Sequence, residues 1–109
     1  MEGGASVAEN NNDGHTALLV AVQNGQLNIV QWLLQEGGAS VVERNSEGFT
    51  ALLWAAHKGH LDIVQWLLQE GGSTITERNN EGYSAIVYAV YGNAQTVQWL
   101  LLHGGANIA

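Results

Sequence analysis

Residues 48–72 read GFTALLWAAHKGHLDIVQWLLQEGG, and residues 14–38 read GHTALLVAVQNGQLNIVQWLLQEGG. The similarity extends over a step of 34 residues, because aligning residues 14–47 with residues 48–81 gives 22 identities in 34 positions. Chance does not produce that agreement. Internal similarity at a fixed step indicates a repeat architecture.

A third copy follows the second and is one residue shorter. It begins at Gly82, and a single deletion after Tyr91 aligns Gly92 with Gly25 and Gly59. We therefore expect a single domain, residues 1–109, in which three units follow a half-connector. The expected boundaries are 1–13 for the N-terminal half-connector, 14–47 for repeat 1, 48–81 for repeat 2 and 82–109 for repeat 3.

Each unit has the pattern of two short helices. In the first unit, Thr16 follows a turn of Asn, Asp and Gly and can cap a helix over residues 17–22. A glycine ends this helix, and apolar residues at helical spacing predict a second helix over residues 27–36. Gly37 and Gly38 then end the second helix, and we expect the first of them at the left-handed cap position.

The connection to the next unit is predicted to be extended at Val41 and Val42. Helices this short are not stable alone in water, so each unit must bury its apolar stripe against its neighbour. Contacts then form between adjacent units. We expect an all-α solenoid of stacked antiparallel helix pairs joined by turn fingers.

Composition limits the possible function classes. The 109 residues include no cysteine, and the net charge is −7 at pH 7. The three basic residues are too few to neutralise a nucleic-acid backbone. No apolar run reaches membrane-spanning length, and the acidic, glycine-rich N-terminus is unlike a signal peptide. We expect a soluble protein of the cytoplasm, with the nucleus as the alternative, and no nucleic-acid or membrane partner.

Residues that support catalysis or metal binding are present but not in suitable patterns. His57 and His60 are three residues apart, but Gly59 interrupts the helix between them, and Asp62 is the one candidate for a third ligand nearby. The acids are scattered, and no pair lies in an apolar run that would raise a carboxyl pKa. Nucleophile-elbow and phosphate-loop patterns are missing. We expect no enzyme activity, no metal and no cofactor.

The repeated unit resembles the ankyrin repeat. Residues 48–68 carry the shared elements Gly-x-Thr-x-Leu-x-x-Ala-Ala and Gly-His-Leu-x-Ile-Val-x-x-Leu-Leu. The Thr-Pro-Leu-His pattern of the family is replaced by Thr-Ala-Leu-Leu at 16–19 and 50–53 and by Ser-Ala-Ile-Val at 84–87. Loss of the histidine predicts a looser link between fingers. The unit is one residue longer than the typical ~33, and we expect the second glycine of each pair to lengthen the arm and leave the helices unchanged.

The resemblance implies a non-enzymatic module that binds another protein through its concave groove and finger tips. Carried over by position, two groups of residues would contact the partner. They are His15, Arg44, Glu47, Phe49, Arg78, Glu81 and Tyr83 on the fingers, and Gln23, Trp54, His57, Lys58, Tyr88 and Tyr91 on the first helices. The negative charge favours a partner with a basic or mixed surface.

The aromatic residues leave some alternatives open. Trp54 either contacts the partner or packs between first helices with only an edge in solvent. Phe49 and Tyr83 follow the finger turn and are expected to be exposed, and Tyr88 is expected to stand beside Trp54 on an open aromatic strip. The residues that recur at one position of the second helix are expected to pack instead of binding: Trp32, Trp66 and Trp99.

The two ends of the array differ. The first unit keeps its full apolar pattern, whereas Ala94 and Thr96 make the third unit more polar, as is typical of a solenoid cap. The uncapped end leaves a second function open. The chain is then a designed or excised structural scaffold without a native partner, which could self-associate through its end repeats.

Overall fold

The computed structural model describes residues 16–106, and this part of the chain is helical. Its elements are α1 (Ala17–Gln23), α2 (Leu27–Gln35), α3 (Ala51–Lys58), α4 (Leu61–Trp66), the π-helical turn η1 (Leu67–Gly71), α5 (Ala85–Gly92) and α6 (Ala94–Leu102). Within the described residues no strand forms, and one isolated β-bridge pairs Arg78 with Ser84. The half-connector predicted at residues 1–13 lies outside the described residues.

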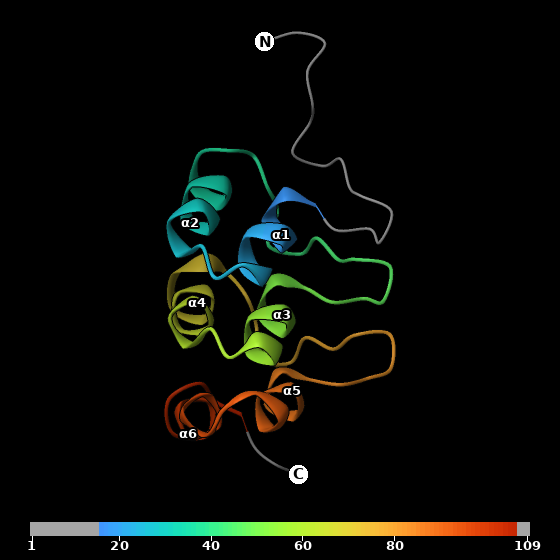
Figure 1. Cartoon of the computed structure of the whole chain (residues 1–109), viewed down its shortest axis with the longest axis vertical. Helices are drawn as coiled ribbons and strands as arrows, with labels where there is room; N and C mark the ends of the chain where they lie inside the picture. The colour runs from blue at the N-terminus through green and yellow to red at the C-terminus, as the bar shows by residue number, and fades with distance from the viewer. Residues whose placement is uncertain (1–15, 107–109) are drawn as a thin grey trace, which may run out of the picture.

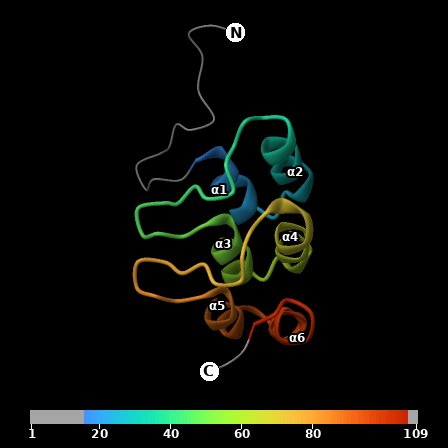
Figure 2. The ribbon, with the colours of Figure 1, turned by 180° about the vertical axis from the view of Figure 1, so that it is seen from behind.

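The helices stack in two columns (Figure 1). One column contains α1, α3 and α5, and the other contains α2, α4 and α6. Each helix of the first column also packs on the second helix of its own repeat. Seen from behind, the finger loops project from the column of first helices (Figure 2). The predicted all-α solenoid of stacked helix pairs is confirmed.

Threonine side chains cap α1 and α3, the first two helices of this column, and link each of them to the start of the finger that follows. Thr50 Oγ1 accepts an N–H of the first turn of α3 at 3.3 Å and donates to Glu77 Oε1 at 2.7 Å. Thr16 donates in the same way to Glu43 at 2.6 Å. Ser84 makes no side-chain cap bond at α5. These bonds connect successive fingers and oppose the looser link between fingers that the missing histidine predicts.

The glycine pairs end the second helices in a different way from that expected. Gly38 and Gly72 have left-handed φ values of 84° and 89°, whereas Gly37 and Gly71 do not have positive φ. The prediction that the first glycine takes the left-handed position was therefore wrong. The first glycine instead leaves room for the tryptophan ring, because a Cβ at Gly71 would lie 2.8 Å from a ring carbon of Trp66 and would force a shift there.

The last turn of the second helix is wider than an α-helical turn. In repeat 2, α4 continues into η1. In repeat 1, the Gly37 N–H bonds the carbonyl of Trp32, five residues earlier, at 2.9 Å. The additional residue of the unit therefore widens the end of the helix, and the expectation that the helices stay unchanged was wrong. A π-turn of this kind accommodates one extra residue without breaking the helix.

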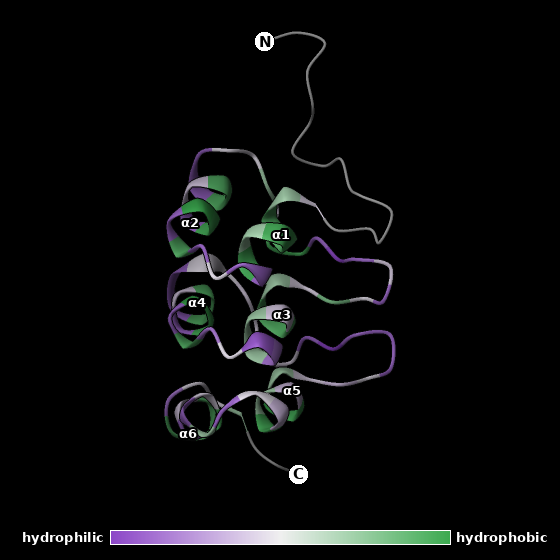
Figure 3. Cartoon of the chain, in the orientation of Figure 1, coloured by the Kyte–Doolittle hydropathy of each residue, from purple (hydrophilic) through white to green (hydrophobic). Residues whose placement is uncertain are grey.

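The arm after α2 is also more compact than predicted. The Glu43 N–H bonds the Ser40 carbonyl at 3.1 Å, so Val41 and Val42 lie in a turn instead of an extended segment. Figure 3 shows that the fingers beyond this arm are mostly hydrophilic, whereas hydrophobic residues gather on the helices. The arm thus brings a polar finger back against the column of first helices.

The core lies between the two columns and between stacked repeats, where Leu18, Leu52 and Leu67 are fully buried. The recurrent tryptophans were predicted to pack, and Trp66 and Trp99 are half-buried. Trp32 is instead 58% exposed. In the described part of the chain no helix packs on the outer side of α2, so this ring lacks the cover that a preceding repeat gives to its equivalents.

Candidate functional site

Five aromatic rings form a continuous group where repeats 2 and 3 meet. We call it the aromatic cluster, and its members are Phe49, Trp54, His57, Tyr83 and Tyr88. The Phe49 ring centroid lies 4.7 Å from that of Trp54 and 4.9 Å from that of Tyr88. His57 lies 5.5 Å from Trp54 and 5.3 Å from Tyr88. Tyr83 packs edge-on against Tyr88 at 5.7 Å.

Two members of the aromatic cluster are less accessible than predicted. Phe49 is 7% exposed and Tyr88 is 8% exposed. The expectation that both rings are open to solvent was wrong, because a ring of repeat 2 and a ring of repeat 3 cover each other across the interface. Trp54 is half-buried, and Tyr83 is 45% exposed as expected. These two residues present the cluster to solvent.

A buried asparagine in the third finger positions Tyr88. Asn79 Oδ1 accepts the N–H groups of Glu81 and Tyr83 at 3.0 and 2.9 Å, and its amide donates to the Tyr88 hydroxyl at 2.6 Å. Burial raises the pKa of the Tyr88 phenol, and the bond from Asn79 partly opposes that shift. Asn45 accepts two N–H groups at 2.9 Å in the second finger. Neither asparagine was predicted as a site residue, although their spacing of one repeat was a usable signal.

His57 and Lys58 complete the cluster at the C-terminal end of α3. His57 Nδ1 is buried without a hydrogen-bond partner. Burial, together with the charge of Lys58, lowers the pKa of the imidazole. Lys58 Nζ lies 5.3 Å from the ring centroid of Trp54, which is within cation–π range. The neutral imidazole is therefore favoured inside the cluster, while the exposed ammonium group lies over the Trp54 ring.

The finger arginines hold the turns and connect them. Arg44 Nη1 donates to the carbonyls of Gly48 and Arg78 at 2.7 and 2.8 Å. Arg78 Nη1 donates to the carbonyl of Gly82 at 3.0 Å. Both arginine side chains are exposed. Each arginine thus stabilises its own finger, and a contact with a partner remains a prediction for both.

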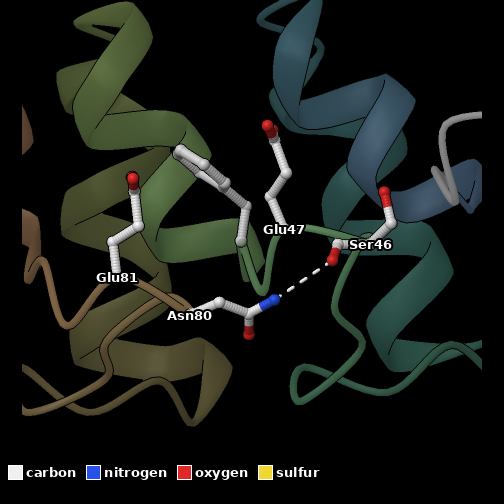
Figure 4. Close-up of a pocket in the computed structure, with 5 residues that line it drawn as sticks. Ser46, Glu47, Asn80 and Glu81 are labelled. Atoms are coloured by element: carbon white, nitrogen blue, oxygen red, sulfur yellow. Dashed lines mark hydrogen bonds between the residues drawn. The ribbon is translucent and has the colours of Figure 1, made fainter.

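A pocket of about 260 Å³ lies between the second and third fingers (Figure 4) and is lined by Ser46, Glu47, Phe49, Asn80 and Glu81. Asn80 joins the two fingers, since its N–H donates to the Glu47 carbonyl at 3.0 Å and its amide donates to the Ser46 carbonyl at 3.1 Å. The side chains of Glu47 and Glu81 extend to the same side (Figure 4). The pocket is therefore acidic, and Phe49 connects it to the aromatic cluster.

The other predicted site residues lie apart from the cluster. Tyr91 is exposed at the end of α5 and makes no ring contact with the cluster among residues 16–106. Gln23 is half-buried, and its backbone carbonyl lies 3.2 Å from His60 Nε2 of the next repeat. His15 lies outside the described residues.

The described residues contain no group of three or more His, Cys, Asp or Glu side chains that could hold a metal ion. None of the helices in this range has both the length and the hydrophobicity that a membrane span needs. The site offers a set of rings, one ammonium group and two carboxylates, carried by α3, α5 and the two fingers between them. Groups of this kind suit recognition by stacking and by charge.

The comparisons with known proteins agree with this architecture. A family model described as ankyrin repeats, in three copies, matches residues 2–79 and residues 41–109. The two matches overlap and together extend over nearly the whole chain. A search of curated proteins gave no match. The chain therefore belongs to the ankyrin repeat family.

Proposed function

We infer that this chain shares the general role of its family, because ankyrin repeats are in general protein–protein interaction modules. We propose that this chain is a non-enzymatic module that binds another protein through its finger tips and the exposed side of its first helices. We call this surface the binding face and define it by its accessible residues: Glu47, Trp54, Lys58, Glu81 and Tyr83. The buried rings of Phe49 and Tyr88 pack against Trp54 and Tyr83, respectively.

The observation that carries the proposal is the continuity of this surface. Ring contacts run from Tyr83 through Tyr88 and Phe49 to Trp54, and Lys58 lies over the Trp54 ring. The buried rings pack against the accessible ones and fix their positions in the absence of a partner. Tyrosine and tryptophan have few rotatable bonds, so they provide contact area at a low cost in conformational entropy.

The charges of the binding face favour a partner that contributes Lys or Arg side chains. Glu47 and Glu81 line the pocket between the fingers, and the chain has a net charge of −7. Opposite charges on two proteins speed their association, and added salt weakens this attraction by screening it. Lys58 adds a positive group at the Trp54 end of the face, so the partner surface is mixed, with its basic part over the fingers.

The test uses partners selected from a displayed library of natural protein fragments. Their affinities are measured for the wild-type chain and for three variants: Trp54→Ala, Lys58→Ala and Tyr83→Ala. We expect the two aromatic variants to weaken binding at least about tenfold, because exposed aromatic anchors dominate interface energies. Tyr88→Ala is unsuitable, because loss of that buried ring would also destabilise the fold.

Trp32→Ala is the matched control, since it removes an exposed tryptophan from the other column. The proposal requires that fragments still bind this variant as they bind the wild type, and that binding weakens as NaCl is added. Fragments that bind Trp54→Ala and Tyr83→Ala as tightly as the wild type would contradict the assignment of the binding face.

A further inference from the structure

The outer face of the third repeat exposes apolar residues at positions that are buried in the repeat before it. Val87 aligns with Leu53 and Val90 aligns with Ala56. Leu53 and Ala56 are fully buried on α3, the helix on which α5 packs, whereas Val87 is 36% and Val90 is 66% exposed. Leu101 on α6 is also exposed. We call Val87, Val90 and Leu101 the C-terminal face.

The outer face of the first repeat shows the complementary exposure. Ile29 aligns with Ile63, which is fully buried on α4 beside α2, but Ile29 itself is 49% exposed. Ala17 aligns with Ala51, which is fully buried, but Ala17 is exposed. We call Ala17, Ile29 and the exposed Trp32 the N-terminal face.

The C-terminal face and the N-terminal face correspond to the two sides of the contact between adjacent repeats, which the molecule forms twice. Within the described residues, α1 packs on α3 and α3 on α5, while α2 packs on α4 and α4 on α6. We propose that a second copy of the chain binds head to tail, so that the C-terminal face of one copy covers the N-terminal face of the next. The near-identity of the first two repeats supports this occupant, because the contact continues an interface whose backbone geometry is already present.

The polar contacts between repeats point to the same arrangement. His60 Nε2 lies 3.2 Å from the Gln23 carbonyl, and Asn93 Nδ2 donates to the Gly59 carbonyl at 3.2 Å. In each case the residue before a second helix reaches the end of the preceding first helix. Gln26 holds this position in the first repeat, and it is exposed. Its amide would meet the carbonyl groups at the end of α5 in the other copy.

This contact has two consequences that separate it from binding at the binding face. A head-to-tail contact leaves one unpaired face at each end, so assembly is open-ended and its extent grows with protein concentration. Copies with a net charge of −7 repel each other. Added salt screens that repulsion, so self-association strengthens with NaCl, whereas binding of a basic partner weakens.

The test is sedimentation velocity over a series of protein and NaCl concentrations, with circular dichroism to show that each variant is folded. Val90→Glu and Ile29→Glu each place a carboxylate in the contact. We expect either change to weaken association at least about 100-fold, because a buried charge without a partner is strongly unfavourable. Val42→Glu is the matched control, since Val42 is an exposed valine on the arm between α2 and α3.

An equal mixture of Val90→Glu and Ile29→Glu gives the sharpest outcome. Each variant keeps the face that the other lacks, so the mixture should form dimers of one copy of each and nothing longer. A wild-type chain that stays monomeric at every concentration and salt level overturns the proposal. So does a loss of association with Val90→Glu but not with Ile29→Glu, which would mean that two C-terminal faces pair with each other. An equal loss of association with Val42→Glu would mean that the added negative charge alone causes the effect, and it would also overturn the proposal.

Discussion

The second and third fingers, residues 43–49 and 77–83, have the same turn and differ in exposure at their last residue. In both fingers a buried asparagine accepts two N–H groups and an arginine donates to the carbonyl of the turn glycine. Phe49 is nevertheless buried and Tyr83 is exposed. The reason is the next repeat, since Tyr88 packs on Phe49 from the side that follows it. Within residues 16–106, no repeat follows the third one to cover Tyr83 as Tyr88 covers Phe49.

Local sequence therefore does not determine which finger residues are accessible. Two side chains at the same position of the same turn have different roles because one of them has a following repeat. Phe49 and Tyr88 stabilise the interface between repeats, while Tyr83 and the open edge of Trp54 remain available for contact. Three predictions test this division between stabilising and accessible residues.

The largest expected effect comes from Tyr88. Tyr88→Ala removes a ring packed against Phe49 and His57 and leaves the Asn79 amide without its acceptor, so we expect a loss of about 3–5 kcal/mol in the free energy of unfolding. Tyr83→Ala removes a largely exposed ring and should cost less than about 1 kcal/mol. Urea denaturation of both variants measures the two values. Equal losses would mean that Tyr83 stabilises the cluster as much as Tyr88 does.

A smaller effect is expected at the residues that directly follow these fingers. Thr50 caps α3 and donates to Glu77 of the next arm, whereas Ser84 makes no cap bond at α5. We expect Thr50→Ala to lower the free energy of unfolding by about 1–2 kcal/mol and Ser84→Ala by less than about 0.5 kcal/mol. Thermal unfolding followed by circular dichroism compares them. If Glu77→Ala, which removes the acceptor, weakens the fold as much as Thr50→Ala does, the bond between the two fingers carries most of the effect.

The smallest effect is expected from the protonation of His57. Burial and the charge of Lys58 lower the pKa of this imidazole below its ordinary value of 6.5. The unfolded chain therefore binds the proton more readily than the folded chain does. Stability is fully present above pH 6.5 and falls as the pH drops from there toward the lowered pKa of the folded state.

The measurement is the urea midpoint between about pH 5 and about pH 8, where histidine is the side chain that ordinarily titrates. His57→Gln is the control for the other histidines, because it removes this ring's titration and leaves theirs. The decline toward acid pH should be smaller in the variant than in the wild type. An identical decline in both proteins would show that protonation of His57 has no effect on stability.

Much of the fold was predictable from residue order. The helices expected at 17–22 and 27–36 were found at Ala17–Gln23 and Leu27–Gln35. Glycine, threonine and apolar spacing act within a few residues, so they mark where helices begin and end. The left-handed second glycine and the wide turn before it were not predicted, because the sequence pattern does not show which of two adjacent glycines takes the left-handed conformation.

The candidate site was predicted only in part. The aromatic residues were identified because they vary between otherwise similar repeats, and Tyr83 was expected to be exposed and is. Phe49 and Tyr88 were placed in solvent because nothing in either segment alone shows that the two rings meet across a repeat interface.

Residue order was sufficient to establish the number of repeats, the helix pairs within them and membership of the ankyrin repeat family, because these features depend on signals that recur every 34 residues. Burial depended on the assembled solenoid. Phe49 lies under Tyr88, while Val90 and Ile29 are uncovered at opposite ends of the stack. The physical reason is that a repeat buries its apolar side chains against its neighbours, so the same position can be core, contact surface or exposed edge according to its place in the stack.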